Sequence, residues 1–158
     1  MAVRARSANL SRCKRYRYVL RRHWGSGDSS VLFVGLNPST ADAHHDDATV
    51  RRCVGFGKRW GFDGLILVNL FAYRSTNPAA LLCSLDPVGP ANDRWIRRVS
   101  SEAKLTVAAW GARGAYLDRD QTVLELLHKP HCLGTTQRGH PRHPLYLPQK
   151  AEPLVLAV

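Results

Sequence analysis

The chain has 158 residues, 44% of them hydrophobic, and a formal net charge of +11. This length allows one hydrophobic core and is too short for two ordinary domains, so we expect a single folded domain over residues 1–158. No stretch holds the roughly eighteen consecutive apolar residues of a membrane span, and no apolar segment of a secretory signal follows the basic N-terminus, which indicates a cytoplasmic protein. The four cysteines have neither metal-site nor disulfide-framework spacing, so we expect them to be reduced.

The excess of positive charge lies in the first 24 residues, which carry eight Lys or Arg and no acidic residue. Residues 1–15 are typical of a basic, flexible arm. From Arg15 to Arg21, arginines alternate with aromatic and aliphatic residues, which predicts a half-buried β-segment with one basic face. Such a face is typical of a surface that contacts phosphates, and we expect Arg15 and Arg17 to do so; a solvated arm that aids solubility is the alternative.

Three short apolar runs further along the chain are typical of strands buried on both faces of a parallel sheet: Val31–Gly35, Leu65–Leu70 and Leu105–Ala109. His131–Leu133 is a weaker fourth candidate. Helical signals separate these runs, and we expect helices from the cap Asp47 to Gly61, from Asn77-Pro78 to Leu82, from Pro90 to Ala103, and over Tyr116 to Leu127 before Pro130. The alternation predicts a three-layer α/β/α domain with a small, mainly parallel central sheet, preceded by the basic N-terminal β-segment.

Polar and aromatic residues follow the predicted strands. The carboxyl ends of parallel strands emerge at one edge of a sheet, where open α/β folds bind their ligands, so these residues should converge. They are Asn37, Pro38 and Ser39, then Asn69 and Phe71, then Trp110, and finally His140 and His143 near the C-terminus. A carboxamide matches the donor and acceptor edge of a base, and Phe71 or Trp110 can stack on its face. The pattern predicts a site for a planar ligand such as a nucleobase.

Four segments at these positions resemble motifs of the uracil-DNA glycosylase superfamily, in particular its mismatch-specific branch. Gly35-Leu-Asn-Pro38 resembles the first motif, and Leu67-Val-Asn69 resembles the strand that ends in a base-reading Asn. Val107-Ala-Ala-Trp-Gly111 is similar to the third strand, and His140-Pro-Arg-His-Pro-Leu145 to a His-Pro-Ser-Pro-Leu loop. Over Tyr16 to Leu147 the sequence more closely resembles DUF1643, an uncharacterised bacterial and phage family.

The glycosylase resemblance implies a uracil-DNA glycosylase-like fold and a DNA glycosylase that excises a flipped, damaged or modified base in DNA repair, with no metal and no organic cofactor. Asn37 would hold the water, Asn69 would select the base, and either His140 or His143 would donate to a base oxygen. We expect Arg142 and Thr136 to contact the nucleic-acid backbone. The alternatives are a non-catalytic nucleic-acid-binding or base-sensing module and an enzyme that acts on free nucleotides or nucleosides.

The run His44-His45-Asp46-Asp47 contains four potential metal ligands. Adjacent residues point apart on a strand and about a quarter turn apart on a helix, so the run does not form a ligand set by itself. We expect Asp47 to cap the following helix and the others to lie in a solvated loop. Asp46 could activate a water if this loop folds over the pocket.

Overall fold

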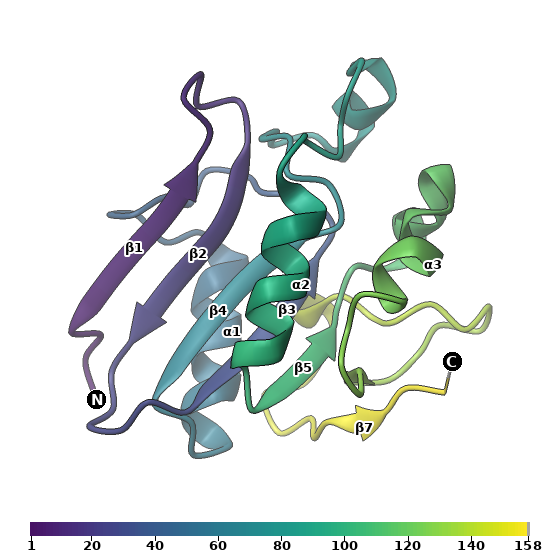
Figure 1. Ribbon diagram of the computed structural model, residues 1–158. Coiled ribbons are helices and arrows are strands. Elements are labelled where there is room, and N and C mark those ends of the chain that lie inside the picture. The colour runs from purple at the N-terminus through teal and green to yellow at the C-terminus, as the bar shows by residue number, and fades with distance from the viewer. Residues whose placement is uncertain (158) are drawn as a thin grey trace.

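The computed structural model describes residues 1–157, and its strands form one seven-stranded mixed sheet (Figure 1). The strands are β1 (Ala5–Leu10), β2 (Arg17–His23), β3 (Ser30–Gly35), β4 (Gly64–Asn69), β5 (Leu105–Ala108), β6 (His131–Cys132) and β7 (Leu154–Val155). Their order in space is β1-β2-β4-β3-β5-β6-β7. The four central strands, β4-β3-β5-β6, are parallel, whereas β1, β2 and β7 pair antiparallel with their neighbours.

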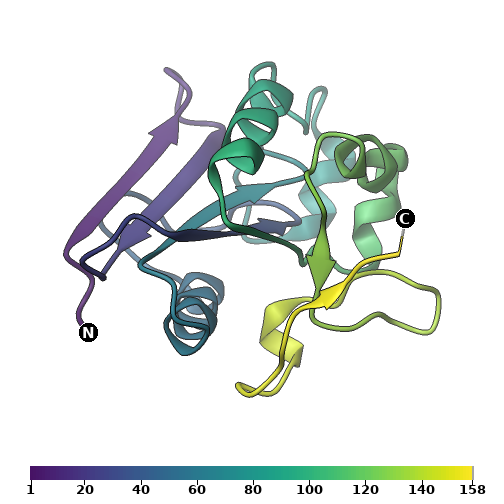
Figure 2. The same ribbon diagram turned by 60° about the horizontal axis from the view of Figure 1, so that its bottom comes forward.

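Helices cover both faces of this sheet, as Figures 1 and 2 show. They are α1 (Ala48–Arg59), α2 (Asn92–Glu102) and α3 (Arg119–Leu124), with the 3-10 helices η1 (Pro78–Cys83), η2 (Ala112–Asp118) and η3 (Pro144–Tyr146). Val50 and Phe56 of α1 pack into one buried cluster, and Ile96 of α2 and Val123 of α3 pack into another. The core therefore has two layers, one on each face. Among residues 1–157, no helix has the length and apolar character needed to cross a membrane.

The predicted buried strands are confirmed as β3, β4 and β5, and the weaker candidate as β6. All six residues of β4 are buried, because α1 covers one of its faces and α2 the other, which explains its uninterrupted apolar run. The predicted cap of α1 is also confirmed: the Asp47 carboxylate accepts a hydrogen bond from the Val50 amide at 2.9 Å. Gly61, with a φ of 83°, follows the end of this helix.

The N-terminal region differs from the prediction in two ways. Residues 5–10 form β1, which pairs with β2, so this part of the expected arm is a sheet edge. The expected basic face is also corrected in part: Arg17 is only 2% exposed, whereas Arg15 is exposed and Arg21 is half-buried. Strand β2 lies between β1 and β4, and both of its faces contribute to the core, so Arg17 and Arg22 are enclosed.

Two other expectations are refined. The sheet is larger than predicted, because antiparallel strands extend the parallel centre at both edges. The last predicted helix is divided into η2 and α3, since Leu117 and Asp118 adopt left-handed backbone angles with φ of 57° and 52°. All four cysteines are free; Cys53 and Cys132 are buried, and the other two are exposed.

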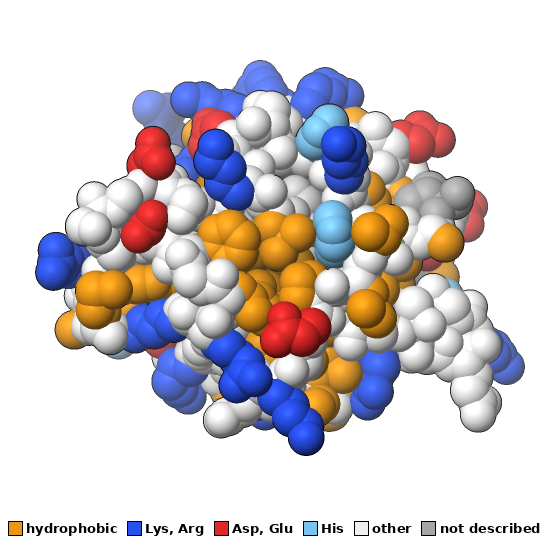
Figure 3. All heavy atoms as spheres, turned by 90° about the horizontal axis from the view of Figure 1, so that it is seen from below, with side chains coloured by type: hydrophobic (Ala, Val, Ile, Leu, Met, Phe, Trp, Pro, Cys, Tyr) orange, Lys and Arg blue, Asp and Glu red, His pale blue; other side chains and the backbone are white. Residues whose placement is uncertain are grey.

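The lower end of the molecule carries the starts of the parallel strands and the β2–β3 turn. Seen from this side, hydrophobic side chains gather in the middle of the face and charged side chains surround them (Figure 3). Trp60, Phe62 and Leu105 line a shallow depression near these strand starts. None of the predicted site residues lines it, whereas several of them line a cavity at the opposite, carboxyl end of the sheet.

Candidate functional site

The site lies where the order of the parallel strands reverses. After β3 the chain forms β4 on one side of it and then returns to form β5 on the other side. Open α/β sheets bind ligands in the crevice that this reversal leaves outside the carboxyl ends of the strands. A cavity of about 550 Å³ opens there, lined by residues that follow β3, β4 and β5. This volume is within the range of small-molecule sites, about 300–1,000 Å³.

Hydrogen bonds continue beyond the strand ends and hold the cavity walls together. The Leu70 amide donates to the Gly35 carbonyl at 2.9 Å, and the Ser75 amide donates to the Pro38 carbonyl at 2.9 Å, so the loops after β3 and β4 run side by side. The buried Asn92 side chain of α2 donates to the Asn69 carbonyl at 3.0 Å. The backbone that carries the site residues is thus fixed by the core.

Three cavity residues carry a buried donor atom without a partner. Four buried side-chain nitrogen or oxygen atoms of the described residues lack a hydrogen bond, and three of these four are Asn69 Nδ2, Trp110 Nε1 and Arg17 Nε, all in residues that line the cavity. Buried polar atoms in folded proteins nearly always have partners. Three donors whose hydrogen bonds the described residues do not satisfy therefore lie in residues of one cavity wall.

Arg17 contributes a buried positive charge to the cavity wall. Its Nη1 atom donates to the Ala41 carbonyl at 2.9 Å, and no carboxylate of residues 1–157 forms an ion pair with it. Burial lowers the pKa of its guanidinium to about 10, so the group stays protonated at neutral pH. This placement differs from the predicted surface contact with a phosphate, and sequence analysis missed the role of Arg17 in the cavity.

Asn37 lines the cavity as predicted, with a fixed amide orientation. Its Nδ2 atom donates to the carbonyls of Pro38, at 3.1 Å, and Ser75, at 3.0 Å. Since both carbonyls require the amide nitrogen, the Oδ1 atom is the acceptor that a water or ligand can use. Pro38 and Ser39, the other two predicted residues of this loop, also line the cavity.

The two candidate histidines have different positions. His143 lines the cavity, and its Nδ1 atom accepts a hydrogen bond from the Leu145 amide at 3.2 Å. Burial lowers the pKa of His143, so the ring is neutral at pH 7 and carries its proton on Nε2. His140 lies outside the cavity lining, in a loop where its amide donates to Thr136 Oγ1 at 3.2 Å.

Three more predicted site residues lie outside the cavity lining. Phe71 is fully buried in the core, where its ring packs against Tyr116 with 5.8 Å between centroids, so it is not available for base stacking. Arg142 is exposed and donates to the Tyr146 carbonyl at 3.1 Å, and Thr136 bonds within its own loop. Tyr146, which sequence analysis missed, lines the cavity and is 76% exposed.

Asp47 is the second cavity residue whose role was missed. It was predicted only as a helix cap, yet it also lines the cavity and is the one acidic residue among the lining side chains that the structure describes. The cap uses its Oδ1 atom, which accepts the bond from Val50. A polar residue that caps a helix directly after a strand-end loop is a signal that could have identified it, since such a cap faces the carboxyl edge of the sheet.

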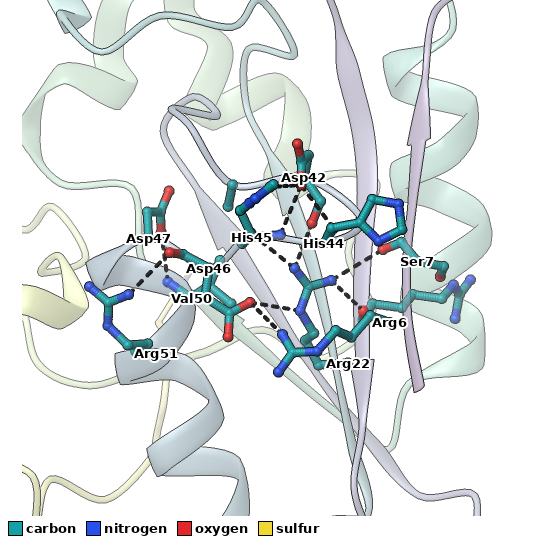
Figure 4. A network of polar contacts seen from close by, with 12 residues as sticks. Arg6, Ser7, Arg22, Asp42, His44, His45, Asp46, Asp47, Val50 and Arg51 are labelled. Carbon is teal, nitrogen blue, oxygen red and sulfur yellow. Dashed lines mark hydrogen bonds and ion pairs between the residues drawn. The ribbon is translucent and has the colours of Figure 1, made fainter. Parts of the chain in front are cut away.

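The buried Arg22 side chain holds the loop that presents Asp47 (Figure 4). Its guanidinium donates to the Asp42 carbonyl at 2.5 Å, to the His45 carbonyl at 3.2 Å and to Asp46 Oδ1 at 2.8 Å. Arg6 of β1 pairs with the same Asp46 oxygen at 3.1 Å. Asp46 is therefore occupied by two arginines, which corrects its expected role as a water activator.

The same loop carries the four potential metal ligands of the run from His44 to Asp47. Asp42 accepts the amides of His44 and His45, both at 2.8 Å, and these hydrogen bonds lower its pKa to about 2. Within the part of the chain that the structure describes, no three His, Cys, Asp or Glu side chains are grouped to hold a metal ion. The histidines of this loop are exposed and face solvent.

Comparison with known proteins identifies the family of this chain. Residues 17–145 match the family model described as "Protein of unknown function (DUF1643)". No curated protein and no solved structure matches the chain. The matched region includes β2 to β6 and every cavity residue discussed above except Tyr146. The resemblance to glycosylases rests on the four motifs alone, whereas the family match covers most of the sequence. The chain therefore belongs to the DUF1643 family.

Proposed function

We propose that the cavity binds a nucleobase flipped out of DNA and that the protein hydrolyses the N-glycosidic bond of a damaged or modified base. The observation that carries this proposal is the set of three unpaired buried donors, on Asn69, Trp110 and Arg17, around a cavity that also contains Asp47 and His143. The arrangement of α1 on one face of the sheet and α2 and α3 on the other is consistent with a glycosylase-like, three-layer fold.

Base recognition would depend on Asn69 and Trp110. Leaving a buried donor unpaired costs about 1–3 kcal/mol, and a ligand that supplies the acceptor recovers this energy. A base with carbonyl oxygens or unprotonated ring nitrogens offers such acceptors in one plane. Tyr146, exposed at the rim, would stack on the base. The site therefore favours a flat ligand with an acceptor edge.

The remaining residues match the needs of glycosidic hydrolysis. In this reaction water attacks the sugar C1′ and loses a proton, the C–N bond breaks, and its electron pair leaves with the base. Asn37 Oδ1 would orient the water and the Asp47 carboxylate would take its proton, a role that a carboxamide alone cannot fill. The neutral His143, through Nε2–H, and the protonated Arg17 would stabilise the negative charge on the departing base.

A panel of oligonucleotides tests this proposal. Single-stranded and duplex substrates that carry different modified bases are incubated with the protein and assayed for alkali-labile abasic sites, with free nucleosides as a parallel series. We expect base release from at least one oligonucleotide and little from nucleosides. If no substrate releases a base although the folded protein binds the oligonucleotides, hydrolysis is excluded and a binding module remains.

Two variants test the assignment of the water. Asp47→Asn keeps the helix cap, because Asn is as good a cap as Asp, but removes the proton acceptor. We expect its rate to fall about 10²-fold or more with oligonucleotide binding retained. Asn37→Ala should also lose activity. Asp28→Asn, an exposed carboxylate in the β2–β3 turn, is the matched control and should be fully active. Wild-type activity in Asp47→Asn would contradict the role of this residue.

A further inference from the structure

Two grooves adjoin the cavity and share different lining residues with it. The first, which we call the α1 groove, has a volume of about 510 Å³ and is lined by Arg51, Arg52 and Arg59. It shares Leu145 with the cavity. The second, which we call the hairpin groove, has a volume of about 430 Å³ and is lined by Lys14, Arg15 and Arg74. It shares Ser39, Ser75 and Thr76 with the cavity, so both grooves border the cavity.

The positive charge of both grooves is uncompensated. No acidic side chain lines either groove in the part of the chain that the structure describes, and none of the six basic residues forms an ion pair with residues 1–157. Some other arginines of the protein are paired, for example Arg22 with Asp46, Arg21 with Glu102 and Arg119 with Asp93. The six basic residues beside the cavity have no such partner among the described residues, so their charge is available to an anionic partner.

We infer that a nucleic-acid strand runs from the hairpin groove, across the mouth of the cavity, to the α1 groove, and that the six basic side chains contact its phosphates. This inference rests on the proposed function, since it supplies the path by which a base in a polymer reaches the cavity. Arginines and lysines along a groove bind such a strand by displacing its counterions. Of the two phosphate contacts expected in the N-terminal segment, this path keeps Arg15, whereas Arg17 lies in the cavity wall.

A nucleic acid fits these features better than a membrane surface does. The six charges lie in two concave grooves separated by a cavity of nucleobase size, whereas anionic lipid headgroups present a broad surface to a protein. A flexible polyanion can follow both grooves and place one base between them. The exposed Tyr146 ring at the cavity rim provides a stacking surface beside that path.

The test measures binding of a fluorescent single-stranded oligonucleotide without any modified base, so that it does not depend on base release. Anisotropy titrations over a range of salt concentrations compare the wild type with Arg51→Gln/Arg52→Gln/Arg59→Gln in the α1 groove and Lys14→Gln/Arg15→Gln/Arg74→Gln in the hairpin groove. Each phosphate contact contributes about 0.7 to the slope of log K against log salt for single strands, so each triple variant should reduce the slope by about 2. We expect affinity at low salt to fall about tenfold or more in each.

Two controls separate the path from total charge and from folding. Arg94→Gln/Arg97→Gln/Lys104→Gln removes three exposed positive charges on and just after α2, on the other face of the sheet, and should change the slope little. Arg51→Lys/Arg52→Lys/Arg59→Lys keeps the charge of the α1 groove and should retain the wild-type slope. If the lysine variant binds as weakly as the glutamine variant, the α1 groove acts through its structure rather than its charge, and the inference is wrong.

Three other results would also overturn it: a wild-type slope in either groove variant, an equal loss in the α2 control, or equal binding of phosphatidylserine vesicles that depends on both grooves. These outcomes are distinct from failure of the proposed function. Absence of base release with slopes that depend on both grooves would leave the strand path intact. Base release with unchanged slopes would refute the path and leave the chemistry.

Discussion

Replacing Arg17 with methionine should separate stability from function, and Arg22 on the same strand provides the comparison. Both side chains are buried in β2, with 2% and 1% exposure. Arg17 makes a single side-chain hydrogen bond, to the Ala41 carbonyl, and its Nε atom has no partner among the described residues. Arg22 makes five hydrogen bonds, one of them within its ion pair with Asp46.

The magnitudes follow from these contacts. Burial lowers the pKa of Arg17 from 12.5 to about 10, which corresponds to about 3 kcal/mol against the charged form in the folded state. Arg17→Met removes this term and leaves the Ala41 carbonyl unpaired, at about 1–3 kcal/mol. The two effects largely cancel, so we expect the free energy of unfolding to stay the same or to rise by up to about 2 kcal/mol. Arg22→Met leaves two loop carbonyls without their donor and Asp46 with Arg6 as its remaining partner, and should lose about 3–5 kcal/mol.

Urea unfolding followed by tryptophan fluorescence measures both variants, and the abasic-site assay measures their function. We expect Arg17→Met to fold with wild-type or slightly higher stability and to lose base release. A destabilised Arg17→Met that matches Arg22→Met would show that Arg17 is structural. A stable Arg17→Met with wild-type base release would refute its role in the cavity.

Three further predictions concern the site and its supporting loop. Gly35→Ala would place a Cβ atom 2.7 Å from Asn69 Oδ1, so it should cost about 1–3 kcal/mol of stability in thermal unfolding and weaken ligand binding. By contrast, a Cβ atom at Gly55 would meet no neighbouring atom within 4 Å, so Gly55→Ala should stabilise α1 by about 0.5–1 kcal/mol. Because the pKa of His143 is lowered from 6.5, the rate of base release should stay constant as pH falls toward 6.5 and decline only at lower pH, where protonation of Nδ1 breaks the hydrogen bond from the Leu145 amide. A pH–rate profile that declines already above pH 6.5 would contradict the role of neutral His143. The hydrogen bonds to the Asp42 carboxylate contribute stability that is full above its unfolded pKa of 3.8 and is lost as pH falls through about 2, so Asp42→Asn should be less stable than the wild type at neutral pH. In urea unfolding, the difference in stability between the wild type and Asp42→Asn should disappear between pH 3.8 and about 2, and a difference that persists at the lowest pH would show that it does not come from the ionised carboxylate.

Much of the local structure could be predicted because it depends on neighbouring residues. The uninterrupted apolar runs identify β3, β4 and β5, since strands covered on both faces need no polar side. The Asp47 cap and Gly61 identify the ends of α1, because a side chain can satisfy the free amides of the first turn and glycine accepts the left-handed angle after the last.

The placement of Asn37, Asn69 and Trp110 in one cavity could be predicted for a similar reason. Asn69 is the last residue of β4, Asn37 and Trp110 follow β3 and β5 closely, and the parallel arrangement brings all strand ends to one edge of the sheet. No knowledge of the loops is needed for this step, because one or two residues beyond a strand leave little freedom to move away from the edge.

The sequence by itself thus determined the parallel strands, the helix caps and the residues next to the strand ends. Only the tertiary structure decided that Arg17 is buried, that His143 rather than His140 lines the cavity, that Phe71 belongs to the core, and that Asp47 faces the site. These outcomes depend on contacts between distant segments. Arg17 is enclosed because β2 pairs with β4, more than 40 residues later in the chain, and the loop before Asp47 is held by Arg22 from another strand. The direction of a side chain in a loop or an edge region is set by such partners, and local sequence patterns carry no information about them.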